Sequence, residues 1–131
     1  MVLDASGAVE LLFNTAAGKR LAARLADEAE IIHVPHLVDL EIAQVLRRYV
    51  MSGVLDERSG ATALQRWRDF RVERYPHEPL LDRVWQLRAN ISVYDAVYVA
   101  LAEALCDVLV TADRRLSRVP GLRVAIETVH V

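Results

Sequence analysis

The sequence predicts an α/β domain, a three-layer α/β/α sandwich around a mostly parallel sheet of four to five strands. Short apolar runs alternate with stretches of helical spacing, which is the pattern of parallel strands connected by helices. The run Val108–Val110 is apolar and mostly β-branched, as is typical of a strand buried on both faces. With 131 residues, 53% of them apolar and 6% aromatic, the chain can bury one aliphatic core. We therefore expect residues 1–131 to form a single domain.

The first part of the chain is expected to form a strand, two helices and a second strand. Val2–Leu3 is a minimal apolar strand, and apolar side chains at helical spacing follow it. Asn14-Thr15 divides this helical stretch in two. The second strand, Glu30–Val34, is stopped by Pro35. The two helices are expected from Asp4 to about Phe13 and from about Ala16 to Asp27.

The rest of the chain repeats this alternation. Ser52-Gly53 is a normal C-terminal signal for a helix, and Asp56 is a residue type that caps the start of the next one. Further strands are expected at Val72–Tyr75, at Val108–Val110 and near Leu122–Ile126. Further helices are expected from about His36 to Met51, from Asp56 to about Phe70, from Glu78 to about Ala89, over Asp95–Leu105 and, as a short helix, over Arg114–Arg118.

Composition restricts the class of protein. The formal net charge of -2 gives no bulk attraction to nucleic acid. The sequence contains no run of 18 apolar residues, so it predicts no membrane span. The N-terminus lacks the pattern of a signal peptide. Cys106, the single cysteine, lies in an apolar stretch and is expected to be a small core residue. These observations favour a cytoplasmic protein.

Four acidic residues are placed where they can converge. Asp4 and Asp113 each follow the carboxyl end of a predicted strand, while Glu41 and Asp95 lie early in helices that follow or precede strands. In a parallel sheet these positions share one edge, which is where open α/β sheets bind ligands. If Val2–Leu3 and Val108–Val110 are neighbouring strands, Asp4 and Asp113 face each other there.

Clustered carboxylates predict a divalent cation, because like charges raise each other's pKa values unless a cation is present. Mg²⁺ and Mn²⁺ are hard ions that prefer oxygen ligands. Such an ion polarises a phosphoryl oxygen and activates water, which is sufficient chemistry for phosphodiester hydrolysis. We expect Asp4, Asp95 and Asp113 to bind the metal and Glu41 to complete the site or help to activate water. The sequence leaves open whether one or two ions bind.

Each acid also has a purely structural interpretation. Asp4 and Asp113 can cap the helices that follow them, and Asp95 can form a capping box with Ser92. Glu41 can form a salt bridge with Arg47 or Arg48. Asp39 lies in the same helix as Glu41, and we interpret it as a first-turn acid favoured by the helix dipole, although it can also join the site.

Two hydroxyls and two arginines accompany the acids. Ser6 is two residues after Asp4, and Thr111 is two residues before Asp113, so either hydroxyl can orient a carboxylate or form a local turn. Arg114 and Arg115 follow the last acid directly and are candidates for contacts with the backbone phosphates of a phosphodiester substrate.

The chain resembles a known family in four segments. These are V-L-D-A-S-G-A, P-H-L-V-D-L-E-I-A-Q-V-L-R-R, S-V-Y-D-A-V-Y-V-A-L-A-E-A-L and L-V-T-A-D-R-R-L. In order and spacing they are similar to PIN-domain ribonucleases, and especially to the VapC toxins of bacterial toxin–antitoxin pairs. In that family the acids matching Asp4, Glu41, Asp95 and Asp113 bind Mg²⁺ or Mn²⁺, and the hydroxyls matching Ser6 and Thr111 lie beside them.

The resemblance implies a metal-dependent endoribonuclease that cuts single-stranded RNA, with tRNA or rRNA as the target. It also implies a homodimer and inhibition by a cognate VapB antitoxin, whose C-terminal segment lies in a groove and reaches the site. Two alternatives share the fold class, a receiver-like phosphoacceptor and a protein-binding module without activity. A receiver needs an acidic pair after the first strand and a late lysine, whereas Asp4 is a single acid and Lys19 lies in an early helix.

Overall fold

The computed structural model describes residues 1–129 and confirms the predicted α/β class. Its five strands form one parallel sheet with the order β3-β2-β1-β4-β5. The short strand β1 is paired with β2 on one side and with β4 on the other, with Val2 opposite His33 and Leu109. The strands are β1 (Val2–Leu3), β2 (Ile32–Pro35), β3 (Val72–Tyr75), β4 (Leu109–Thr111) and β5 (Ile126–Thr128).

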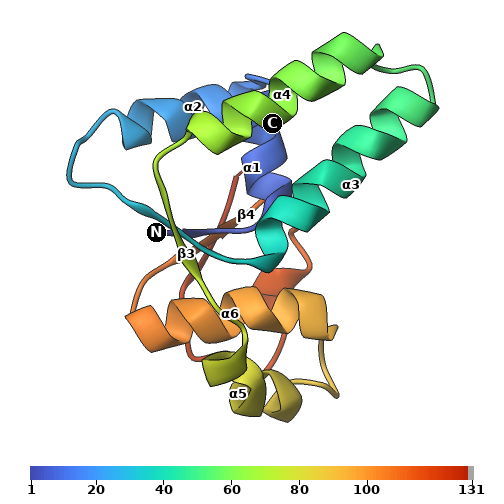
Figure 1. Ribbon diagram of the computed structural model, residues 1–131. Helices are drawn as coiled ribbons and strands as arrows, with labels where there is room; N and C mark the ends of the chain where they lie inside the picture. Colours follow the sequence, from blue (N-terminus) through green and yellow to red (C-terminus); the bar gives the residue numbers. More distant parts are fainter. Residues whose placement is uncertain (130–131) are drawn as a thin grey trace.

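Helices cover both faces of the sheet, which gives the predicted three layers (Figure 1). One face carries α1 (Ala5–Leu12), α2 (Ala16–Leu25), α3 (Leu37–Met51) and α4 (Glu57–Asp69). The other face carries the 3₁₀ turn η1 (Glu78–Leu80), α5 (Leu81–Gln86) and α6 (Val93–Leu105). A second 3₁₀ turn, η2 (Leu116–Arg118), follows β4. Across residues 1–129, no helix combines the length and the apolar character that crossing a membrane requires.

The core lies around the two central strands. Val2, Leu3, Leu109 and Val110 are fully buried, because α1 packs on one face of the sheet and α6 on the other. All residues of α6 from 96 to 102 are buried as well. The carboxyl ends of β1 and β4 are therefore held side by side by packing on both faces.

Three expectations about the C-terminal half are wrong in detail. The last strand is β5 at Ile126–Thr128, not Leu122–Ile126, because α6 and α5 hold the preceding segment. Glu103 accepts a hydrogen bond from the backbone of Arg123 at 2.8 Å, and Arg83 donates to the carbonyl of Gly121 at 2.9 Å. The expected helix from Glu78 to Ala89 is a 3₁₀ turn followed by a short α5, and the expected helix Arg114–Arg118 is the 3₁₀ turn η2.

Cys106 is exposed, which corrects the expectation that it belongs to the core. It ends α6 with a left-handed backbone, with φ of 51°. Asp107 directly follows it and forms a 2.9 Å ion pair with the N-terminal ammonium. The apolar side chains around Cys106 therefore belong to the end of α6 and the start of β4, while the Cys106 side chain itself is exposed between them.

Candidate active site

The four acids lie at the carboxyl edge of the sheet, where β1 and β4 are neighbours. On one side of this pair the chain continues from β1 to β2 and β3, and on the other side it continues from β4 to β5. The strand order therefore reverses between β1 and β4, which is the topological switch point of the sheet. Asp4 follows β1 directly, and Asp113 comes two residues after β4. Glu41 lies in α3, and Asp95 lies in the first turn of α6. Four separate segments therefore contribute to one region.

Asp4 is the most enclosed of these acids, with 6% of its surface exposed. Its Oδ1 accepts hydrogen bonds from Ser6 Oγ at 2.7 Å and from the backbone of Gly7 at 2.9 Å. Its Oδ2 accepts a hydrogen bond from Thr111 Oγ1. Ser6 Oγ in turn accepts from the backbone of Ala112 at 2.9 Å. These bonds cap α1 and also lock the Asp4 carboxylate to the end of β4.

Glu41 is held by Tyr98 and not by the arginines considered from the sequence. Tyr98 Oη donates a 2.5 Å hydrogen bond to Glu41 Oε1. Burial and the neighbouring Glu41 carboxylate raise the pKa of the Tyr98 phenol, so it remains a donor. Sequence reasoning missed Tyr98, although its spacing of three from Asp95 places both on one face of α6.

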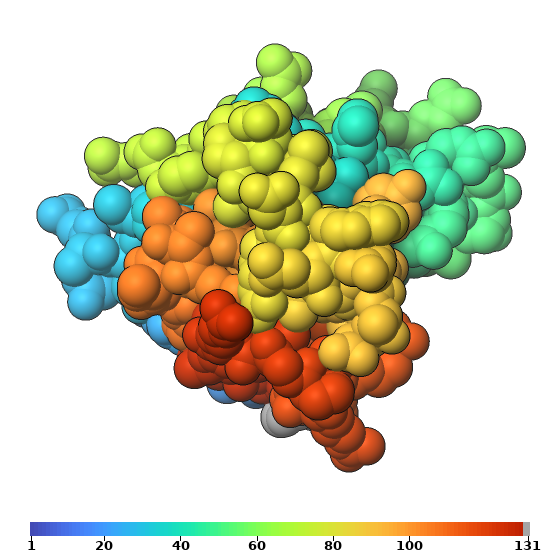
Figure 2. All heavy atoms as spheres, turned by 90° about the horizontal axis from the view of Figure 1, so that it is seen from below, coloured from blue at the N-terminus to red at the C-terminus, as the bar shows by residue number. Residues whose placement is uncertain are grey.

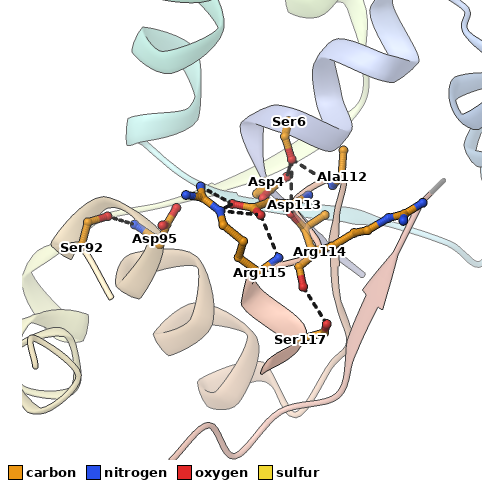
Figure 3. A network of polar contacts seen from close by, with 10 residues as sticks. Asp4, Ser6, Ser92, Asp95, Ala112, Asp113, Arg114, Arg115 and Ser117 are labelled. Atoms are coloured by element: carbon orange, nitrogen blue, oxygen red, sulfur yellow. Dashed lines mark hydrogen bonds and ion pairs between the residues drawn. The ribbon is translucent and has the colours of Figure 1, made fainter. Parts of the chain in front are cut away.

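Asp95 and Asp113 lie on either side of an arginine (Figure 3). The backbone amide of Asp95 donates to Ser92 Oγ at 3.1 Å, so the expected cap by Ser92 is present. Asp113 accepts bonds from the Arg115 guanidinium, from Nε at 3.0 and 3.1 Å and from Nη2 at 2.7 Å. The Arg114 side chain points away from Asp4 and Asp95 in the same view.

The pKa directions show that the carboxylates affect one another. Burial raises the pKa of Asp4, against the bonds that it accepts, and Asp95 raises it further. Burial is the main cause that raises the pKa of Glu41, and the charges of Asp95 and Asp4 raise it further. Burial is also the main cause that raises the pKa of Asp95, and the charge of Asp113 adds to it. Hydrogen bonds from Arg115 lower the pKa of Asp113. Three of the four acids are therefore disfavoured as anions in this region.

The donor set fits a hard divalent cation in type and in charge. All four groups are carboxylates, and their mutual repulsion is what a cation would relieve. Within residues 1–129, however, no group of three or more acidic, histidine or cysteine side chains is already arranged to hold an ion. The Arg115 guanidinium is at present the cation bonded to Asp113.

Asp39 lies apart from the other acids. Trp67 Nε1 donates to its Oδ1 at 2.7 Å, and Arg74 Nε donates to its Oδ2 at 2.8 Å. Burial alone would raise the pKa of Asp39, but the bonds from Arg74 and Trp67 outweigh it and lower the pKa. Asp39 therefore ties α3 to α4 and to β3.

Comparison with known proteins identifies the family. Residues 1–122 match the family model described as PIN domain. The chain is 52% identical over 117 residues to VapC ribonuclease Mb0985 of Mycobacterium bovis, covering 89% of this chain and 88% of that one. The chain belongs to the PIN-domain family of VapC ribonucleases.

Solved structures agree with this PIN fold. VapBC2 of Rickettsia felis, bound to a DNA fragment from its promoter, matches with a TM-score of 0.72 and 17% identity, covering 97% of this chain and 96% of that one. VapC20 of Mycobacterium tuberculosis, a toxin that cleaves the sarcin-ricin loop, matches with a TM-score of 0.67 and 16% identity, covering 92% and 95%. The family assignment leaves the receiver-like alternative without support.

The raised pKa values predict an unusual pH dependence for the stability of this PIN domain without divalent ions. A carboxyl group whose pKa is raised by folding binds more protons in the folded state, so its contribution to stability falls as pH rises above its ordinary value of about 4. In EDTA, the melting temperature of wild type should therefore fall relative to that of Asp4→Asn as the pH rises from about 4 to about 7. Thermal unfolding followed by circular dichroism measures this difference. Parallel curves for the two proteins would contradict the prediction.

Proposed function

We propose that this VapC-type protein is an endoribonuclease that depends on Mg²⁺ or Mn²⁺ and cuts single-stranded RNA. Asp4, Asp95 and Asp113 would bind the ion, and Glu41 would complete the site. The observation that carries the proposal is the convergence of these acids at the switch point of the sheet, with three pKa values raised. RNA loops expose the phosphodiester bonds that such a site can reach.

The chain's own side chains have distinct tasks in this proposal. A bound divalent ion would supply polarisation of a phosphoryl oxygen and activation of water. Ser6 and Thr111 hold the Asp4 carboxylate in one orientation. Tyr98 holds Oε1 of Glu41, and in this proposal Oε2 would accept a proton from the attacking water. No covalent intermediate is needed.

Loss of the Tyr98 hydroxyl should weaken cleavage by roughly 10-fold at pH 7. Tyr98→Phe removes the hydrogen bond that lowers the pKa of the half-buried Glu41, so this pKa should rise further. The acidic limb of the cleavage rate should therefore move to higher pH. Rates measured from about pH 5 to pH 9 test this expectation. An unchanged acidic limb would exclude Glu41 as the proton acceptor.

We further propose that a VapB-type antitoxin binds the groove between α3 and α4. This cavity of about 290 Å³ is lined mainly by apolar side chains, including Leu46, Val50 and Leu64. An amphipathic segment of a partner would bury its apolar face there. The structural similarity to a VapBC complex is consistent with this partner.

Two arginines next to the site are the proposed contacts with the RNA substrate. Arg114 and Arg115 are exposed beside Asp113 and can contact backbone phosphates. We propose tRNA or rRNA as the target, and the description of VapC20 as a toxin that cleaves the sarcin-ricin loop supports a structured RNA. Mapping of new 5′ ends after brief expression identifies the target.

We also propose a cytoplasmic homodimer. Leu81, Trp85, Val93 and Tyr94 are large apolar side chains exposed on α5 and at the start of α6. This face is turned to the viewer in Figure 2, with α5 in yellow beside α6 in orange. A second copy of the chain would cover these side chains, since exposed apolar patches mark interaction surfaces. Sedimentation equilibrium measures the mass in solution.

The proposed activity is tested with single-stranded RNA and purified protein. We expect cleavage with Mg²⁺ or Mn²⁺, none with excess EDTA, and recovery when the ion is restored. Equal cleavage in EDTA would contradict the metal dependence, and no cleavage under any of these conditions would contradict the ribonuclease assignment.

A further inference from the structure

Arg115 occupies both carboxylate oxygens of Asp113. Its Nε lies 3.0 and 3.1 Å from Oδ1 and Oδ2, and its Nη2 lies 2.7 Å from Oδ2. Its backbone amide also donates to Oδ1 at 2.9 Å. The two residues are separated by one position in the chain, so this arrangement needs no other element to form.

The guanidinium also acts on a second acid. It lies on the side of Asp113 that faces Asp95, as Figure 3 shows. The charge of Arg115 lowers the pKa of Asp95, against the effect of Asp113. One positive side chain therefore compensates two of the proposed metal ligands.

The ion pair between Arg115 and Asp113 can break at little cost in free energy. The side chain of Arg115 is 87% exposed, whereas that of Asp113 is 25% exposed. Exposed ion pairs are weak because water screens them and because they restrict two side chains. Displacing Arg115 uncovers no buried charge on the arginine, which can move into solvent without breaking the fold.

We propose that Arg115 is a tethered cation that competes with the divalent ion for Asp113 and so sets the metal affinity of the site. This inference rests on the proposed function. A guanidinium bonded to both oxygens and a divalent ion on the same oxygens would repel each other, so binding of one weakens binding of the other. Metal binding then releases the guanidinium, which becomes available for the phosphate contact proposed above.

The competition has a predictable size. When the binding-competent state is only partly populated, the apparent affinity falls by that fraction. An exposed ion pair of this kind lowers the apparent metal affinity of the site by a factor of up to about five. Arg115→Gln should therefore bind Mn²⁺ about 3- to 10-fold more tightly than wild type, since it also removes a repelling charge.

Calorimetric titration with Mn²⁺ tests the proposal without RNA. The matched control is Arg118→Gln, which removes one exposed positive charge from η2. Within residues 1–129, the Arg118 side chain makes no bond to an acid of the site. Arg115→Lys keeps the charge but loses the paired bonds, so its affinity should lie between those of wild type and Arg115→Gln. Melting temperatures in EDTA check that the variants fold.

The outcomes separate this inference from the proposed function. Tighter Mn²⁺ binding by Arg115→Gln but not by Arg118→Gln supports the competition. Equal or weaker binding by Arg115→Gln overturns it, while Mn²⁺ binding by wild type would leave the proposed metal dependence standing. If neither wild type nor Arg115→Gln binds Mn²⁺, both the inference and the proposed metal dependence fail.

Discussion

Asp4→Asn is expected to abolish RNA cleavage, with a loss of at least about 100-fold, while the protein still folds. Asn has nearly the same shape, and its oxygen can still accept the hydrogen bond from Gly7 that caps α1. The substitution removes the most buried negative charge proposed to bind the metal. Initial rates of single-stranded RNA cleavage in Mn²⁺ measure the effect.

Asp39→Asn is the matched control for this prediction. Asp39 is also an acid at the start of α3, but it is bonded to Trp67 and Arg74 and lies apart from the four acids. Its substitution should leave the cleavage rate within about 3-fold of wild type and lower stability modestly, since a hydrogen bond to a charged group is lost. If Asp4→Asn cleaves as fast as Asp39→Asn, the site assignment is wrong.

Gly18→Ala should lower the free energy of unfolding by about 3 kcal/mol or more. A Cβ atom at this position of α2 would lie 2.0 Å from the carbonyl oxygen of Glu10 and 3.0 Å from Cα of Leu11. These are backbone atoms of α1, so α1 and α2 would have to separate. Because α1 carries Asp4 at its start, such a shift would also disturb the site. Urea unfolding measures the loss.

Gly60→Ala in α4 provides the comparison. Its added Cβ would approach the Val50 side chain at 2.7 Å, and this contact is with a side-chain methyl group that can rotate or shift. Alanine also favours a helix over glycine by up to about 1 kcal/mol. We expect Gly60→Ala to be close to neutral. Similar losses for both variants would show that the approach of α1 and α2 is not the cause.

The sequence was most informative where a polar or acidic residue lies at the end of a strand or at the start of a helix. Asp4 and Asp113 follow apolar strands, so the pattern of a parallel sheet was enough to predict that they share an edge. The capping role of Ser92 was predicted in the same way, from its spacing to Asp95. These features depend on local sequence and on general rules of sheet topology.

Features that depend on tertiary contacts were not predicted. The bond from Tyr98 to Glu41 joins α6 to α3 and is present in place of the salt bridges that the sequence offered as an alternative for Glu41. The position of β5 depends on Glu103, which holds the segment before it. Arg115 was expected to contact RNA, and its bonds to Asp113 follow from a turn that propensity does not reveal. Partners distant in the chain decide the first two of these cases, whereas Arg115 and Asp113 are only two positions apart.

A crystal of the protein grown with Mn²⁺ would test the central claim most directly. The account predicts an anomalous difference peak at the carboxyl edge of β1 and β4, about 2.0–2.3 Å from oxygens of Asp4, Asp95 and Asp113. It also predicts that Arg115 has moved away from Asp113. A structure at saturating Mn²⁺ in which the ion binds elsewhere, with the pair of Arg115 and Asp113 intact, would contradict it.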